Sequence, residues 1–243
     1  MLVTSLLLFL LGTALIGGSW AQTYMPGVAE GDTFTYDITG FWNSNDPSAT
    51  IPQSFLELNE TDYYEVRINS TSGAEVMADS VRHFKNGSDV TYALGIVNLQ
   101  TGVASSALLI LAANLNANDR IHPTGQDTIT INETVIRNYL GEDRETNHLM
   151  FTHQENGSSG TLDRYFDRET GMLVELRDET SYVNPDTTII VWWKIKETSS
   201  AGRPIWGNPM EIPWFLIIPI LVVIAVIIGV LFYIKKKRKR KKH

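Results

Sequence analysis

The densest cluster of side chains able to form hydrogen bonds is the run Arg144-Glu-Thr-Asn-His148, which follows Gly141-Glu142-Asp143 directly. A guanidinium, a carboxylate, an amide and an imidazole can recognise a polar partner, because each supplies directional donors or acceptors. The sequence leaves two interpretations open, a recognition patch at a sheet edge and a turn whose charges pair across strands. The four members of the candidate recognition patch are Arg144, Glu145, Asn147 and His148.

Catalytic and metal chemistry has weaker support. His148 and His153 are five residues apart, so on one regular strand they point to opposite faces and do not share a metal ion. Gly157-Ser-Ser-Gly160 lacks the Gly-x-Ser-x-Gly pattern of a nucleophile elbow. The chain has no cysteine, which excludes thiol catalysis and cysteine-ligated metals. We expect a protein that is not an enzyme and has no catalytic, metal or cofactor-binding residue. A hydrolase that uses two of its 27 acidic side chains is the alternative.

Aromatic residues suggest another role. A curved antiparallel sheet can line an apolar pocket with such side chains and hold a lipid in it, although ordinary core packing would also use them. The residues concerned are Phe34, Tyr36, Phe41, Trp42, Tyr165, Phe166, Trp192 and Trp193.

Alternation of apolar and polar residues predicts the strands that would carry these groups. Phe34, Tyr36 and Ile38 alternate with polar residues, and Ile189, Val191, Trp193 and Ile195 form a second stripe of period two. The same pattern recurs in 63–69 and 172–179. It predicts a mainly β fold with a curved, half-barrel-like antiparallel sheet.

Turn residues divide the strands. Asn86-Gly87 and Asn156-Gly157 are typical of hairpin turns, where Asn-Gly supplies the positive φ angles of type I′. Asp167–Gly171 predicts a turn closed by a left-handed glycine, and Asn184-Pro185-Asp186 another reversal. The C-terminal half should therefore be a four-stranded antiparallel meander. Short helices are expected in 51–58 and 105–115.

The ends of the chain predict membrane targeting. Residues 1–21 combine the apolar stretch Leu6–Ile16 with Ser19-Trp20-Ala21, which matches a signal-peptidase site; an uncleaved anchor is the alternative. The 23-residue run 212–234 has no charged side chain and would span about 35 Å as a helix, enough to cross a bilayer. Between them we expect an extracellular β domain, 22–198, and a linker, 199–211.

A polybasic tail, residues 235–243, follows this run. Basic residues mark the side of a membrane that is not translocated, so the chain should be a single-pass type I protein of the cell membrane, with the tail in the cytoplasm. We expect the tail to contact anionic lipid headgroups of the bilayer. The contacting residues would be Lys235, Lys236, Lys237, Arg238, Lys239, Arg240, Lys241 and Lys242.

Charge separates the two sides. All 27 acidic residues and 12 of the 20 basic residues precede the tail, so the outer segment carries −15 and the tail +8. The acidic outer segment would repel phosphates, and we expect no nucleic-acid partner. A domain of this size can bury a core without disulfides.

Glycosylation is expected on the exported side, because five Asn-x-Ser/Thr sequons fall in the outer segment and none in the apolar run. The acceptor residues would be Asn59, Asn69, Asn86, Asn132 and Asn156.

Four segments, 31–36, 41–47, 144–149 and 165–174, resemble uncharacterised archaeal single-pass surface proteins. Their sequences are GDTFTY, FWNSNDP, RETNHL and YFDRETGMLV. The resemblance implies a signal peptide, a β-rich glycosylated ectodomain, one C-terminal helix and a basic tail, and it brings no catalytic residues. The hairpin 167–171 is also similar to hairpins of lipoprotein-carrier half-barrels, which implies a sheet wrapped around acyl chains.

These observations favour a membrane-anchored cell-surface protein that binds an extracellular protein or lipid ligand without catalysis. The alternatives are a lipid or lipoprotein carrier with an apolar pocket, and a surface hydrolase with paired carboxylates. A concave apolar hollow would favour the carrier, and two carboxylates facing each other in a cleft would favour the hydrolase.

Overall fold

The computed structural model describes residues 24–103, 109–155, 157–183 and 186–199. All of them belong to the first of two units into which the chain divides, Met1–Arg203. The expected signal peptide, the apolar run 212–234, the basic tail and most of the linker lie outside the described residues. Within the described residues, no helix is long and apolar enough to cross a membrane.

The described residues form a mainly β fold with one large antiparallel sheet that does not close on itself. Its strand order is β4-β3-β2-β1-β9-β8-β7-β6-β5, so β4 and β5 are the two edges. One helix, α2 (Gln53–Asn59), joins β1 to β2. The strands are β1 (Thr33–Ser44), β2 (Thr61–Ser72), β3 (Glu75–Phe84), β4 (Asp89–Asn98), β5 (Glu133–Tyr139), β6 (Glu142–Glu155), β7 (Ser158–Asp167), β8 (Leu173–Val183) and β9 (Asp186–Ser199).

Local sequence signals are mostly confirmed. Strands β6 to β9 form the predicted meander, and each pairs antiparallel with the next. The short helix expected in 51–58 is present as α2, Gln53–Asn59. At Asn86-Gly87 only the glycine has positive φ (82°), so the type I′ turn expected there is wrong, although the hairpin is present. The predicted helix in 105–115 is also wrong for its described part, 109–115, which contains no helix.

That part is an irregular segment of the core, with a turn at Ala113 and Asn114. Leu111 donates its backbone N–H to Gly171 at 2.9 Å, and Ile110 forms an isolated bridge with Met172. Tertiary contacts therefore outweigh the helix propensity of an Ala- and Leu-rich sequence. The buried apolar residues of segment 109–131 are Leu109, Ile110, Leu111, Ala112, Leu115, Ile121 and Ile131.

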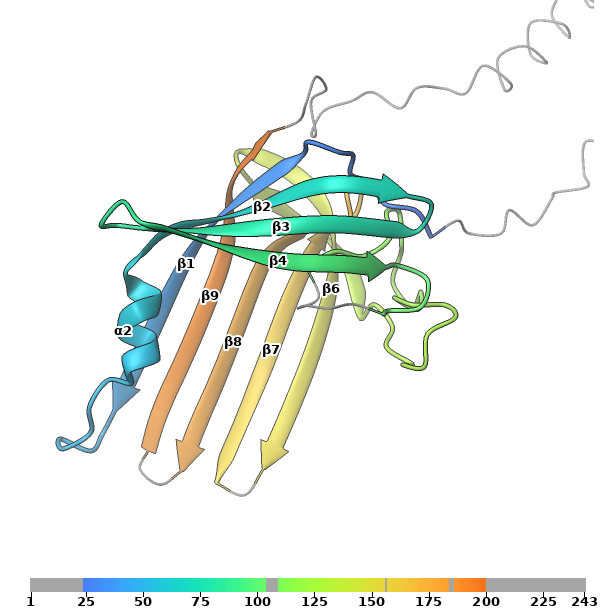
Figure 1. The fold of residues 1–243 in the computed structure, drawn as a ribbon. Helices are drawn as coiled ribbons and strands as arrows, with labels where there is room; N and C mark the ends of the chain where they lie inside the picture. Colours follow the sequence, from blue (N-terminus) through green and yellow to red (C-terminus); the bar gives the residue numbers. More distant parts are fainter. Residues whose placement is uncertain (1–23, 104–108, 156, 184–185, 200–243) are drawn as a thin grey trace, which may run out of the picture. The chain divides into compact units, whose positions relative to one another are not determined.

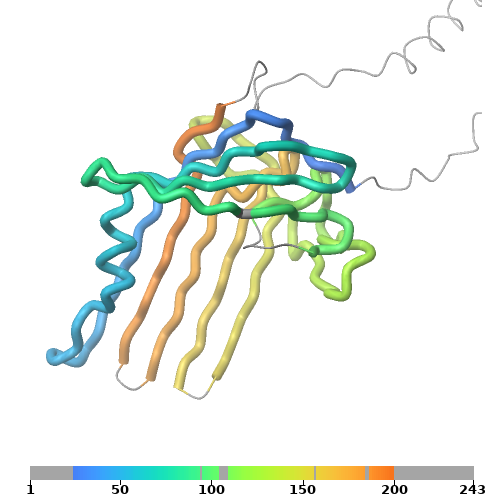
Figure 2. The backbone as a smooth tube through the Cα atoms, in the orientation of Figure 1, coloured from blue at the N-terminus to red at the C-terminus, as the bar shows by residue number. Residues whose placement is uncertain are grey.

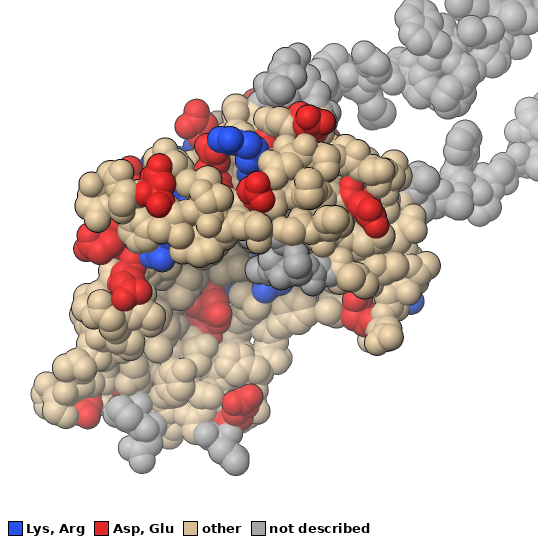
Figure 3. Space-filling model, in the orientation of Figure 1, with Lys and Arg blue, Asp and Glu red and all other residues tan. Residues whose placement is uncertain are grey.

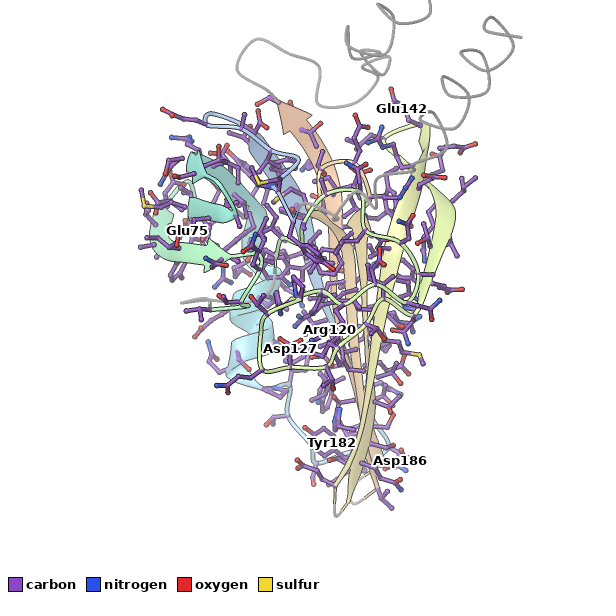
Figure 4. The ribbon with its side chains drawn as sticks, turned by 90° about the vertical axis from the view of Figure 1, so that its right-hand side faces the viewer. Glu75, Arg120, Asp127, Glu142, Tyr182 and Asp186 are labelled. Atoms are coloured by element: carbon purple, nitrogen blue, oxygen red, sulfur yellow. The ribbon has the colours of Figure 1, made fainter. Side chains whose placement is uncertain are left out.

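The sheet bends around this segment. In Figure 1, β2, β3 and β4 run across the direction of β6 to β9. Figure 4 shows the two groups of strands apart, with the segment that carries Arg120 and Asp127 between them. The path of the backbone from β4 through this segment to β6 can be followed in Figure 2. We call the face of the sheet that carries Phe34, Tyr36 and Ile38 the inner face, and the opposite one the outer face.

The register arranges the inner face in rows that cross five strands. One row contains Ile38, Trp193, Leu176, Arg164 and Leu149. The next row, one step towards the β6–β7 and β8–β9 hairpins, contains Gly40, Val191, Asp178, Leu162 and Phe151. Ile38 and Leu149, the two ends of the first row, are buried, whereas every member of the second row is partly exposed.

Candidate functional site

The four residues of the candidate recognition patch do not converge. Alternation along β6 places Arg144 and His148 on the outer face and Glu145 and Asn147 on the inner face. Asn147 is buried and donates its Nδ2 hydrogen to the Leu115 carbonyl at 3.0 Å. The patch is therefore split between two faces and largely occupied by contacts within the protein.

Arg144 and Glu145 form ion pairs across strands. Arg144 donates from Nε and Nη2 to Asp167, at 2.9 and 3.1 Å, and pairs with Glu169 at 2.7 Å. Glu145 pairs with Arg168. Burial disfavours the charge of Arg144, but these carboxylates outweigh burial and raise its pKa. The pairs fasten the β7–β8 turn, which is the cross-strand arrangement that the alternative interpretation expected.

His148 lies between two carboxylates. Its Nδ1 is 3.1 Å from Glu133 Oε1, its Nε2 is 2.8 Å from Asp163 Oδ1, and its ring stacks on Tyr165 at 4.3 Å. Both ring nitrogens are therefore occupied, and the imidazole fills the space between the carboxylates. A hydrolytic carboxylate pair needs that space, about 5 Å or more, for substrate or water.

A second polar cluster on the outer face surrounds Glu175, which is 7% exposed. Its Oε1 accepts a hydrogen bond from Trp192 Nε1 at 3.0 Å, and its Oε2 accepts from Tyr139 Oη at 2.8 Å and Arg137 at 3.0 Å. Burial and the neighbouring Glu175 raise the pKa of Tyr139. The carboxylate accepts three hydrogen bonds from β5 and β9, so the cluster ties β5 to β8 and β9 and stabilises the sheet.

Metal binding finds no support in the part of the chain that the structure describes, where no three His, Asp or Glu side chains come close enough to hold an ion. Two hollows on the domain surface are also polar. One, of about 540 Å³, is lined by Thr152, His153, Gln154, Ser159, Gly160, Thr161, Glu179 and Ser181. The other, of about 380 Å³, is lined by Thr33, Thr35, Asp62, Tyr63, Glu65, Lys196, Glu197 and Ser199.

The inner face passes from a filled half to an open half through the row of Leu149, in which Trp193 and Leu176 are already partly exposed. Phe34, Tyr36, Leu149 and Phe166 are at most 1% exposed beneath the segment 109–131. Beyond the row of Leu149, towards the hairpins, large apolar side chains are only half buried. They are Trp42, Phe151, Leu162, Ile189 and Val191. We call this part of the inner face the open half.

Figure 3 looks onto this face and shows a hollow beneath β4, with acidic and basic atoms inside it. Helix α2 flanks the open half on the β1 side, because a Cβ at Gly40 would lie 2.8 Å from the Phe55 ring. The open half is therefore an apolar surface bounded by α2 on one side, and it includes Trp42 from the predicted aromatic set.

Two charged side chains belong to this part of the inner face. Arg164 is in the row of Leu149, and Asp178 is in the next row, on the neighbouring strand. Burial lowers the pKa of Arg164, and Asp178 opposes that effect. The guanidinium carbon lies 5.9 Å from the centre of the Phe151 ring. Among the described residues, the buried Nε of Arg164 has no hydrogen-bond partner.

The sequence patterns alone do not single out Arg164, Phe151 or Leu162. The signal was present, because Leu162, Arg164 and Phe166 alternate with Asp163 and Tyr165, and a cation inside an apolar stripe is unusual. Whether such a stripe is covered depends on tertiary structure, which the alternation does not reveal.

The sequons differ in their surroundings. Asn59 and Asn69 donate Nδ2 hydrogens, to the Gly40 carbonyl and to Asp79. Asn86 and Asn132 are exposed. The Oδ1 atom of Asn86 accepts hydrogen bonds from Ser88, and that of Asn132 accepts one from Met150. Asn156 lies outside the described residues.

Comparison with known proteins adds no relative to this description. No family model, curated protein or solved structure matches the chain.

Proposed function

We propose that the chain is a membrane-anchored cell-surface protein that binds the apolar part of an amphiphilic ligand on the open half of its inner face. In this proposal the protein holds its ligand without chemical change. A single-pass type I topology would keep the β domain outside the cell, and the tail 235–243 would contact anionic lipids inside.

One observation carries the proposal: five large apolar side chains near the β6–β7 and β8–β9 hairpins remain partly exposed on the inner face, and none of them is fully buried. Complete burial of one such side chain is worth about 1.5–3 kcal/mol. At most about a third of each of the five is exposed, so covering what remains would contribute up to roughly 4 kcal/mol, less than the membrane affinity of one acyl chain. An apolar ligand that covers these side chains would therefore gain free energy that folding of the domain leaves unused.

The shape of the sheet supports the same proposal. An open, bent antiparallel sheet with one filled half is half-barrel-like, and the resemblance of the hairpin 167–171 to lipoprotein carriers points the same way. The polar clusters around Glu175 and His148 are occupied internally, which makes them poor candidates for ligand binding.

Site-specific photocrosslinking tests the proposal. Leu162 and Thr161 are adjacent on β7, and strand alternation directs them to the inner and outer faces. In the full chain expressed in its membrane, p-benzoylphenylalanine in place of Leu162 should form lipid adducts detected by mass spectrometry. The same substitution of Thr161 is the matched control. Equal adduct formation at both positions, or adducts at Thr161 alone, would refute the proposal.

A further inference from the structure

We infer that Arg164 makes the open half selective for an amphiphile with an anionic headgroup. This inference rests on the proposed function and adds the chemical class of its ligand.

Arg164 differs from the other described arginines in having no hydrogen bond or ion pair with any described residue. Each of the others donates at least one hydrogen bond within the protein. They are Arg67, Arg82, Arg120, Arg137, Arg144, Arg168 and Arg177. A guanidinium carries five N–H donors, so Arg164 keeps unused capacity for an acceptor.

The position of Arg164 fits a headgroup at the inner end of an apolar track. Its cross-strand neighbours on the inner face are Leu149, which is fully buried, and Leu176, which is partly exposed. On the other side, Phe151 and Leu162 belong to the open half. The cation therefore stands where the filled half of the face ends and the uncovered apolar surface begins.

The surroundings make an anion favourable there. A half-buried cation loses hydration, and an ion with its own acceptors restores what the apolar neighbours cannot supply. A carboxylate or phosphate suits the guanidinium fork particularly well. Asp178 lies one row away and offsets part of the positive potential of Arg164, but the two side chains do not form an ion pair.

Orientation follows from the same geometry. With its headgroup at Arg164, the ligand would extend its tail past Leu162 towards the β6–β7 hairpin. Arg164 is six positions along β7 from its first residue, Ser158, a distance of ~20 Å at ~3.4 Å per residue. Apolar side chains of β6, β7 and β9 flank the first part of that path.

Paired photoreactive probes test the inference in the full chain reconstituted in lipid nanodiscs. One probe is palmitate with a diazirine in its tail, and the other is hexadecanol with the same diazirine. In the wild type, palmitate should label the open half more strongly than hexadecanol. Arg164→Met should reduce palmitate labelling about 10-fold to 100-fold and leave hexadecanol labelling unchanged, because only the charge-assisted hydrogen bonds are lost.

Three further variants sharpen the result. Arg164→Lys keeps the charge and should retain part of the preference. Asp178→Asn removes the opposing charge and should raise palmitate labelling, roughly twofold to fivefold. Arg177→Met is the matched control, because Arg177 lies on the outer face and is half exposed; it should change neither probe.

The outcomes separate the two proposals. If both probes label the wild type equally and Arg164→Met does not alter their ratio, the selectivity is wrong and amphiphile binding stands. If neither probe labels the open half of the wild type, the inference and the proposed function are both wrong. Retained hexadecanol labelling of Arg164→Met shows that this variant is folded.

Discussion

Replacing Glu175 by Gln measures what the outer-face cluster contributes to stability. The carboxylate accepts three hydrogen bonds, from Trp192, Arg137 and Tyr139, and it is 7% exposed. An amide keeps the shape of the side chain but has one acceptor oxygen and no charge. Its NH₂ group must then face at least one of the three donors.

The magnitude follows from the three contacts. A hydrogen bond to a charged group contributes about 1.5–3 kcal/mol and a neutral one about 0.5–1.5, so each contact loses ~1 kcal/mol. Water can replace part of the loss, because Arg137 and Trp192 are 36% and 41% exposed. We therefore expect Glu175→Gln to lower the free energy of unfolding by ~2 kcal/mol. In a domain of this size that corresponds to a Tm lower by about 4–8 °C.

Thermal unfolding of the full chain in detergent, followed by far-UV circular dichroism, is the assay. Glu179→Gln is the matched control, since Glu179 lies on the same strand and face, and its pair with Arg177 is exposed on both sides. Such a surface pair is worth less than ~1 kcal/mol, so this Tm should fall by ~2 °C or less. Equal shifts in both variants, or an unchanged Tm in Glu175→Gln, would refute the role assigned to the buried carboxylate.

Three other predictions concern the same domain. Burial and a neighbouring carboxylate raise the pKa of Tyr139, so its contribution to stability is complete below about pH 10 and falls as the pH rises further. Above pH 10, the free energy of unfolding measured in urea should fall less steeply with pH in Tyr139→Phe than in the wild type, by ~1.4 kcal/mol per pH unit. Glycopeptide mass spectrometry of the native protein should find higher occupancy at Asn132 than at Asn69, whose Nδ2 is engaged. Finally, Gly171→Ala should destabilise by ~3 kcal/mol or more and Gly157→Ala by ~1, compared by urea unfolding. Both have positive φ, but only at Gly171 would a Cβ meet a backbone oxygen, at 2.1 Å.

Strands and hairpins could be predicted because their signals are local. The stripe Ile189–Ile195 and the turn Asp167–Gly171 each specify a conformation through neighbouring residues. In the turn, Asp167 accepts hydrogen bonds from the backbone and side chain of Thr170, and Gly171 adopts a φ of 75°. These contacts span three or four residues, so the sequence pattern contains them.

The sheet order and the buried clusters could not be predicted in the same way. Strand β9 pairs with β1, which begins 153 positions earlier in the sequence. Glu175 collects its donors from positions 17 to 38 residues away. The Ala and Leu content of segment 109–115 predicts a helix, yet its apolar side chains pack into the core beside the sheet without forming one. Composition reports what such residues prefer in isolation, whereas burial decides where they lie.

The division of the inner face explains how one sheet can combine stability with an uncovered apolar surface. Strands β6 to β9 extend beyond the filled half, and in the open half nothing described covers their inner face. Their long antiparallel pairing holds these strands together, and on the outer face the pair of His148 with Asp163 joins β6 to β7. The open half is consequently not needed to maintain the sheet. Substitutions at Leu162 should alter binding before they alter folding, whereas those at Leu149, one row away, should do the reverse.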